Sequence, residues 1–198
     1  MSLVEIRVII IVYLSAFLPL LVLFYLYKVS KLKKSYLNIY IFSFIFCALG
    51  WEVWFTYGLF GGDPVDLRRS DILNFYIPKD FNWILNSMAD AGTISLGGLF
   101  LSSKISGKDF LSWSWSFFFI FFTWCLVQNL FVEIFLYFDQ LSIGKTLSWA
   151  PFAPTGSWFN PVLFEYSDRT IHLQTQLPWI IMAPILMKAA IFFRSSEL

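Results

Sequence analysis

The sequence has few of the residues that soluble enzymes use to bind metals, form disulfides or contact water. It contains two cysteines and one histidine in 198 residues, and charged residues make up only 14%. Two cysteines cannot build a disulfide scaffold. Sites for haem, copper, zinc or paired iron usually need several His or Cys ligands. We therefore expect neither a metal site nor a cofactor.

Nucleotide and nucleic-acid signatures are missing as well. The sequence has no GxGxxG and no GxxxxGK[ST] segment, the fingerprints of dinucleotide and P-loop binding. A net charge of +1 gives no field that would attract nucleic acid. A soluble domain carries about 25% charged residues, and disorder requires low hydrophobicity. At 58% hydrophobic residues, the remaining class is a membrane protein, and no motif assigns it to a family.

Five hydrophobic stretches are long enough to cross a bilayer, which takes about 20 mostly apolar residues. We expect spanning helices over residues 6–27, 37–60, 81–103, 111–138 and 177–193. The first is interpreted as a retained helix, because its lysines follow the apolar run, whereas a signal peptide has them before it. The sequence predicts an all-α integral membrane bundle in which residues 1–198 form a single membrane domain.

Basic residues in the short connections predict the orientation. Four lysines connect the first two helices, Lys104 and Lys108 lie between the third and the fourth, and Arg194 follows the fifth. These positions fall on one predicted side, which we assign to the cytoplasm. The amino end is then outside and the carboxyl end inside, and we expect the host to be the cytoplasmic membrane of a bacterium.

Two predicted outer loops, 61–80 and 139–176, hold most of the non-helical sequence. In the first, Ser70 is placed to cap a short helix that runs through Tyr76. In the second, Pro151, Pro154 and Pro161 argue against one long helix. A loop of that length is usually functional or packed on the surface, so we expect it to cover the outer face as a lid. No repeat relates the two halves, which disfavours an inverted-repeat transporter.

Polar side chains inside the predicted spans mark the candidate site, since each of them is costly in a bilayer. Asn86 and Asp90 lie four residues apart on one face of the third helix, and Asn129 and Glu133 do so on the fourth. Glu52 lies in the second helix. At about 1.5 Å of rise per residue, all five are ~8–14 Å below the outer ends of their helices. We expect these faces to point inward and to bring the three acids together.

Aromatic side chains adjoin these polar stripes. Aromatic faces stabilise cations, and carboxyl groups give or take protons, so the tryptophans beside the acids are candidate binding residues: Trp51, Trp54, Trp83 and Trp124. His172, close to the predicted lid, is a further binding candidate, and an interfacial hydrogen-bonding role explains it equally. Amides in membranes also join helices to one another, and we prefer that interpretation for Asn82.

These features fit three functions. The first is a membrane-embedded enzyme that acts on a lipid or isoprenoid by proton transfer, as an isomerase, hydratase or cyclase. Glu52, Asp90 and Glu133 would be its acid and base groups, and Asn86 and Asn129 would orient them.

The second is a non-catalytic subunit or assembly factor of a larger membrane complex, with the small residues Ser87, Ala91 and Ser95 as a helix-packing face. The third is an ion- or amine-coupled carrier. The expected partners are membrane lipid, a hydrophobic small molecule or another membrane protein, and not nucleic acid.

Overall fold

The computed structural model describes residues 1–58, 64–109, 112–136, 161–166 and 169–196 of the chain. Four helical segments are long and apolar enough to cross a membrane: α1 (Leu3–Lys28), the run Lys79–Ser106, the run Trp115–Leu136, and α10 (Leu173–Ser195). The bent pair α2 (Lys34–Leu49) and α3 (Trp51–Tyr57) makes a fifth if it is counted as one segment. The prediction of a mostly helical protein with several helices long and apolar enough to cross a membrane is confirmed.

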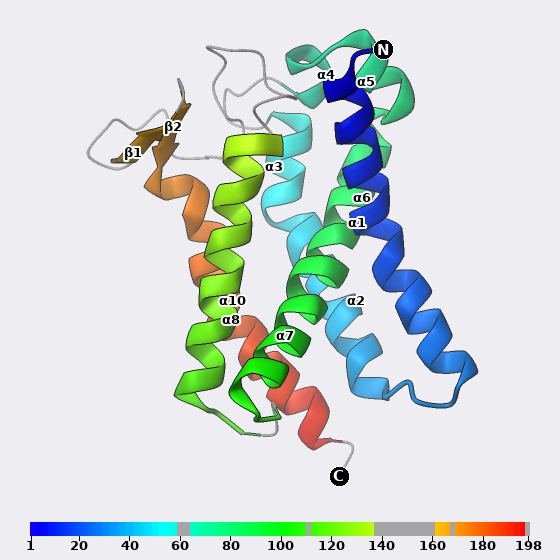
Figure 1. The fold of residues 1–198 in the computed structure, drawn as a ribbon, viewed down its shortest axis with the longest axis vertical. Helices are drawn as coiled ribbons and strands as arrows, with labels where there is room; N and C mark the ends of the chain where they lie inside the picture. Colours follow the sequence, from blue (N-terminus) through cyan, green and yellow to red (C-terminus); the bar gives the residue numbers. More distant parts are fainter. Residues whose placement is uncertain (59–63, 110–111, 137–160, 167–168, 197–198) are drawn as a thin grey trace.

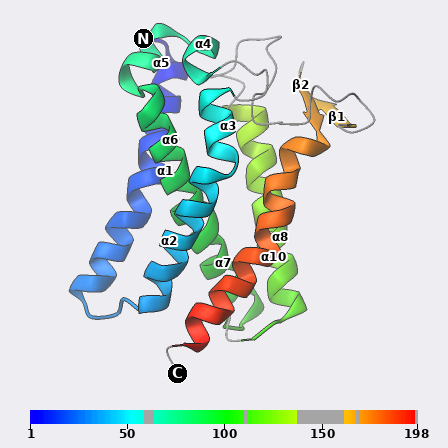
Figure 2. The ribbon, with the colours of Figure 1, turned by 180° about the vertical axis from the view of Figure 1, so that it is seen from behind.

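The helices form an elongated bundle in which α8 (Trp115–Phe131) lies between α7 (Gly97–Ser106) and α10 (Figures 1 and 2). The opposite side of the bundle is formed by α1, which packs against α6 (Lys79–Ala89). The α1–α2 turn, the α7–α8 turn and the carboxyl end of α10 lie at one end (Figure 1). The basic connections singled out in the sequence are therefore at the same end of the molecule.

The other end carries α4 (Val65–Arg68), α5 (Asp71–Tyr76) and a two-stranded hairpin (Figure 1). The predicted cap is confirmed, since the Ser70 hydroxyl accepts a hydrogen bond from the Leu73 amide and α5 ends at Tyr76. Ser70 also donates to a Glu5 carboxylate oxygen at 2.6 Å, which ties α5 to the start of α1. Within α5, the Leu73 side chain is buried, whereas the Phe75 side chain is 77% exposed.

The antiparallel hairpin consists of β1 (Val162–Tyr166) and β2 (Arg169–His172), in which Glu165 pairs with Thr170. It leads directly into α10, whose N-cap is His172. Pro151 and Pro154 of the predicted lid lie outside the described residues, so the lid stays a prediction.

A bend of 44° separates α2 from α3 at Gly50. A Cβ atom at this position would lie 2.7 Å from the Phe46 carbonyl oxygen, so a larger residue cannot adopt this backbone without a shift. The Ala48 carbonyl belongs to the last turn of α2, where carbonyls lack an intrahelical donor. It accepts a hydrogen bond of 2.8 Å from the Trp83 indole of α6, and this contact stabilises the bend.

Two of the long helices change to π-helical winding. The segment η2 (Asp90–Leu96) joins α6 to α7, and η3 (Val132–Leu136) continues α8. π-Helical segments are rare in proteins, and those that occur are often found at functional sites. In η2 the Ile94 carbonyl accepts a hydrogen bond of 3.0 Å from the Trp124 indole, so a side chain of α8 holds the altered winding.

Candidate functional site

Two of the three predicted acids lie together at the junction of α3 and η2. Glu52 is only 2% exposed, at the first turn of α3 beyond the Gly50 bend. Asp90 is the first residue of η2 and is partly exposed. The two carboxyl groups interact electrostatically. The Gly50 bend and the π-helical segment therefore meet where these two acids are placed.

Neighbouring side chains hold this pair, named here the Glu52–Asp90 pair. The Trp51 indole donates a hydrogen bond of 2.8 Å to Asp90 Oδ2. Asn86, one turn before Asp90 on α6, lies beside the Glu52 carboxyl group. One oxygen of Glu52 is buried without a hydrogen-bond partner among the described residues. The pair therefore has unused hydrogen-bonding capacity.

No basic side chain of the described residues is hydrogen-bonded or ion-paired to either carboxyl group. Two carboxylates in a low-dielectric setting repel each other and lose hydration, so charging both is costly. A shared proton removes most of that cost. The same arrangement provides an acid and a base side by side.

The buried thiol of Cys47 lies near both acids of this pair, and that of Cys125 lies near Asp90. Cys47 belongs to α2 and Cys125 to α8, and both are fully buried. In these surroundings we interpret them as small apolar residues. They place α8 against the Asp90 side of the pair.

The third acid, Glu133, belongs to a separate polar group between α8 and α10. Its Oε2 atom accepts a hydrogen bond of 2.5 Å from the Gln176 amide. Asn129 donates to Gln176 Oε1 at 2.8 Å and to the Thr175 carbonyl at 3.0 Å. All four residues are at most 5% exposed. We call them the Asn129–Glu133 network.

The expected single group of three acids is thus divided between two places in the structure. The described contacts of Glu133 are with α10, and those of Asp90 are with Trp51 and Glu52. Equal depth along the helices is compatible with the placement of Glu52 and Asp90. The described contacts of Glu133 lead to α10 instead, because depth does not fix the direction in which a side chain leaves its helix.

The remaining predicted residues have different positions. Trp83 and Trp124 bind backbone carbonyls at the Gly50 bend and in η2, as described above. Trp54 is partly buried on α3. His172 is partly buried at the start of α10, and its carbonyl accepts a hydrogen bond of 2.7 Å from the Thr175 hydroxyl. Of the predicted tryptophans, Trp51 is the one whose described hydrogen bond goes to an acid of the pair.

Two arginines of the first predicted outer loop point into the protein, and their described hydrogen bonds go to backbone carbonyls and asparagine side chains. Arg68 is fully buried, donates to the Phe55 carbonyl and packs over the Phe55 ring at 4.9 Å. Arg69 donates to the side-chain oxygens of Asn74 (2.8 Å) and Asn82 (2.9 Å) and to a backbone carbonyl. Burial lowers the pKa of Arg69 to about 10, so its guanidinium is still charged at neutral pH.

The helix-packing face expected for a partner protein is used within the chain. Ser87, Ala91 and Ser95 are all 0% exposed. Ala91 lies in a core cluster with Leu23 of α1 and Tyr40 of α2. Among the described residues, no three His, Cys, Asp or Glu side chains are grouped so that they could hold a metal ion.

Comparisons of the chain with protein-family models, with curated proteins and with solved structures found no match.

Proposed function

We propose that this chain is a membrane-embedded acid–base enzyme that acts on a hydrophobic substrate, such as a lipid or isoprenoid. The observation that carries the proposal is the Glu52–Asp90 pair, in which Glu52 is buried and Asp90 is partly exposed. The pair lies next to a π-helical segment and has no basic partner among the described residues. An acid and a base held side by side suit an isomerase, hydratase or cyclase.

The two carboxyl groups have different roles in this proposal. Asp90 is the more exposed of the two and contacts the substrate, while Glu52 exchanges the shared proton with it. In an isomerisation, the protonated carboxyl donates its proton to an olefinic carbon. The carboxylate then removes a proton from the neighbouring carbon, so the double bond moves and the pair returns to its starting state.

Aromatic rings beside the pair would stabilise the intermediate cation. The Trp51 ring lies 5.1 Å from the Trp179 ring, centroid to centroid, and Trp51 is fixed by its bond to Asp90. Ring faces attract positive charge by about 0.5–2 kcal/mol. Glu133, bonded to Gln176, serves in this proposal to hold α8 against α10.

The proposal includes five crossings of a bacterial cytoplasmic membrane, with the amino end outside. It is supported by the placement of the lysine-bearing turns and the carboxyl end of α10 at one end of the bundle (Figure 1). Cysteines introduced as Phe75→Cys and Lys31→Cys test it with a membrane-impermeant maleimide on intact cells. We expect the first to react directly and the second only after permeabilisation. The reverse pattern would invert the topology.

Solvent deuterium tests the chemistry whichever lipid is the substrate. The purified chain is reconstituted with a total lipid extract in D₂O, and carbon-bound deuterium in the lipids is followed by mass spectrometry. Each protonation of carbon transfers solvent deuterium, so we expect time-dependent incorporation into one lipid class. Glu52→Gln and Asp90→Asn should each abolish it.

Glu165→Gln is the matched control, because Glu165 is exposed on β1. It should retain the full incorporation. If the wild-type chain incorporates no deuterium into any lipid, or if both pair variants incorporate as much as the wild type, the proposed function is wrong.

A further inference from the structure

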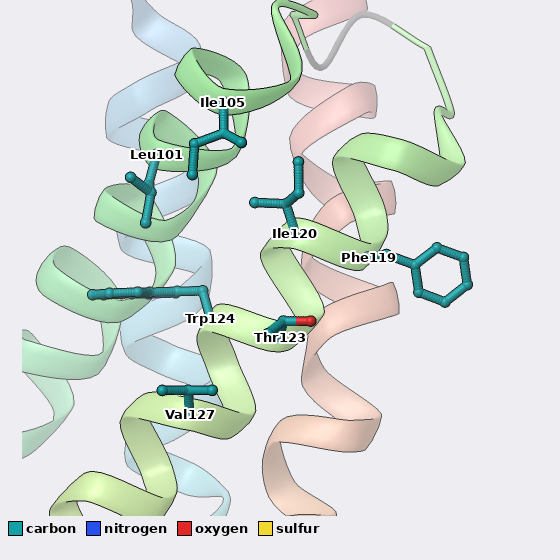
Figure 3. A pocket seen from close by; sticks show the side chains of 7 residues that line it. All are labelled: Leu101, Ile105, Phe119, Ile120, Thr123, Trp124 and Val127. Carbon is teal, nitrogen blue, oxygen red and sulfur yellow. The ribbon is translucent and has the colours of Figure 1, made fainter.

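A groove of about 440 Å³ runs between α7 and α8 on the outside of the bundle (Figure 3). Its walls are almost wholly apolar. Leu101 and Ile105 line it from α7, and Ile120, Thr123, Trp124 and Val127 line it from α8. In Figure 3 Leu101, Ile105 and Ile120 lie near the α7–α8 turn, and Val127 lies farthest from it.

The deeper part of the groove is shaped by Trp124. Its indole is fixed by the hydrogen bond to the Ile94 carbonyl. The ring lies directly over Gly98, where a Cβ atom would be 2.8 Å from the indole nitrogen and 2.9 Å from a Phe121 ring carbon. The absence of a side chain at Gly98 lets the indole lie flat against α7, which leaves room for the groove beside it.

Two lysines that do not line the groove lie near its end at the α7–α8 turn. Between Leu101 and Val127 the sequence contains three charged residues, Lys104, Lys108 and Asp109. Asp109 is paired with Arg194 at 3.7 Å, so its charge is compensated. Lys108 is exposed and its ammonium group lies 3.2 Å from the Ser114 hydroxyl, at the base of α8. Lys104 is exposed one turn above it, with its ammonium group 5.4 Å from the centre of the Phe100 ring, so holding a phosphate would require this side chain to turn toward the groove.

Aromatic side chains lie at the same end of the groove. Trp115 is 61% exposed and stacks on Phe119, a further lining residue of the groove, at 5.8 Å. Tryptophan gathers at the level of lipid headgroups. From Phe119 to Val127 the helix rises about 12 Å, and one leaflet contributes about half of the ~30 Å hydrocarbon core. The stretch of α8 that lines the groove is therefore about as long as the hydrocarbon part of one leaflet.

From this geometry we infer that the α7–α8 groove is a specific site for an anionic phospholipid of the leaflet next to the α7–α8 turn. One acyl chain lies along Leu101, Ile120 and Val127, and its phosphate is held by Lys104 and Lys108. An apolar groove has little preference of its own in a bilayer, because lipid tails are as apolar as leucine. The selectivity comes from the lysines, each of which contributes about a fivefold preference for an anionic headgroup.

Native mass spectrometry of the purified full-length chain tests the site. Dioleoyl phosphatidylglycerol and dioleoyl phosphatidylcholine have the same tails, so their affinities differ only through the headgroup. We expect phosphatidylglycerol to bind about 10- to 30-fold more tightly. Lys108→Gln should reduce this ratio by about fivefold, and the double change of Lys104 and Lys108 to Gln should remove it.

Two further variants separate the groove from general surface charge. Lys31→Gln removes a lysine from the α1–α2 turn, at the same end of the bundle but away from the groove, and should leave the ratio unchanged. Thr123→Trp fills the groove and should weaken phosphatidylglycerol binding, while an unaltered unfolding temperature shows that the chain is still folded. Glycerol phosphate, which lacks tails, should not compete.

Equal binding of the two lipids by the wild-type chain would overturn the inference. So would a loss with Lys31→Gln as large as that with Lys108→Gln. If the chain is instead a dimer that Thr123→Trp dissociates, a second copy occupies the groove and the lipid assignment is wrong.

Discussion

The contact between η2 and α1 should be unusually sensitive to a single methyl group. Gly92 of η2 faces Pro19 of α1, and a Cβ atom at Gly92 would overlap the Pro19 Cβ atom and lie 2.5 Å from Cγ. Pro19 lies inside a helix, and its ring cannot rotate away. Gly92→Ala therefore requires the two helices to move apart.

Gly97→Ala is the matched comparison, five residues further along the same helical run. A Cβ atom there meets only the Gly92 carbonyl oxygen at 3.7 Å, an ordinary contact. Replacing glycine by alanine within a helix favours folding by up to about 1 kcal/mol in both variants. That gain cancels in the comparison, so the difference between the two variants measures the overlap alone.

Overpacking of this kind costs about 1–3 kcal/mol. At about 2–4 °C per kcal/mol for a chain of this size, Gly92→Ala should unfold roughly 2–12 °C below Gly97→Ala. Thermal unfolding in detergent, followed by size-exclusion chromatography of a fluorescent fusion, measures the difference. If both variants unfold at the same temperature, the close approach of α1 and η2 described here is incorrect.

Three further variants test the polar contacts outside the Glu52–Asp90 pair. Arg69→Gln breaks three hydrogen bonds and leaves the buried Asn82 side chain without its donor, so we expect a loss of about 2–4 kcal/mol in unfolding free energy. The surface pair of Lys79 with Asp66 is one-third exposed, and Lys79→Gln should cost less than about 1 kcal/mol. Gln176→Leu removes the buried donor to Glu133 and one of the two acceptors of Asn129, and it should cost about 2–3 kcal/mol.

Reversible unfolding in mixed detergent micelles measures all three free energies. Gln128→Leu is the control for Gln176→Leu, because the hydrogen bond that Gln128 makes among the described residues goes to the Cys125 carbonyl of its own helix. Its effect should stay within about 0.5 kcal/mol. If Lys79→Gln proves as costly as Arg69→Gln, burial does not govern these contacts. If Gln128→Leu matches Gln176→Leu, the Asn129–Glu133 network does not join α8 to α10.

The helices could be predicted from the sequence because their signal is local. Runs of apolar residues define them, and the described helix ends lie within about four residues of the predicted ones. The bend at Gly50 and the winding of η2 were not predicted. Each depends on an indole from a distant helix, Trp83 at the bend and Trp124 at η2. A single sequence gives no information about which carbonyl such an indole will reach.

The candidate site could be predicted only in part, because the sequence gives the depth of a side chain along its helix but not its direction around the helix axis. Rise along a helix gives the depth of a side chain, and depth placed Glu52 and Asp90 at compatible levels. The direction around the helix axis depends on which neighbours pack where, and it sends Glu133 to α10. The role of Gln176 was missed for the same reason. The polar run Gln174–Thr175–Gln176 was the available signal, because three such residues at the start of an apolar helix need partners.

The π-helical winding of η2 also has a consequence for insertions and deletions. A π-helical turn closes its hydrogen bonds over five residues and an α-helical turn over four, so Asp90–Leu96 holds a surplus residue relative to α-helical winding. Removing one residue can be absorbed by rewinding the segment as an α-helix, which leaves Gly98 beneath Trp124 and Leu101 beside α8. Inserting one residue has no such outlet and would rotate everything after it by about 100°. This segment should therefore tolerate a deletion better than an insertion.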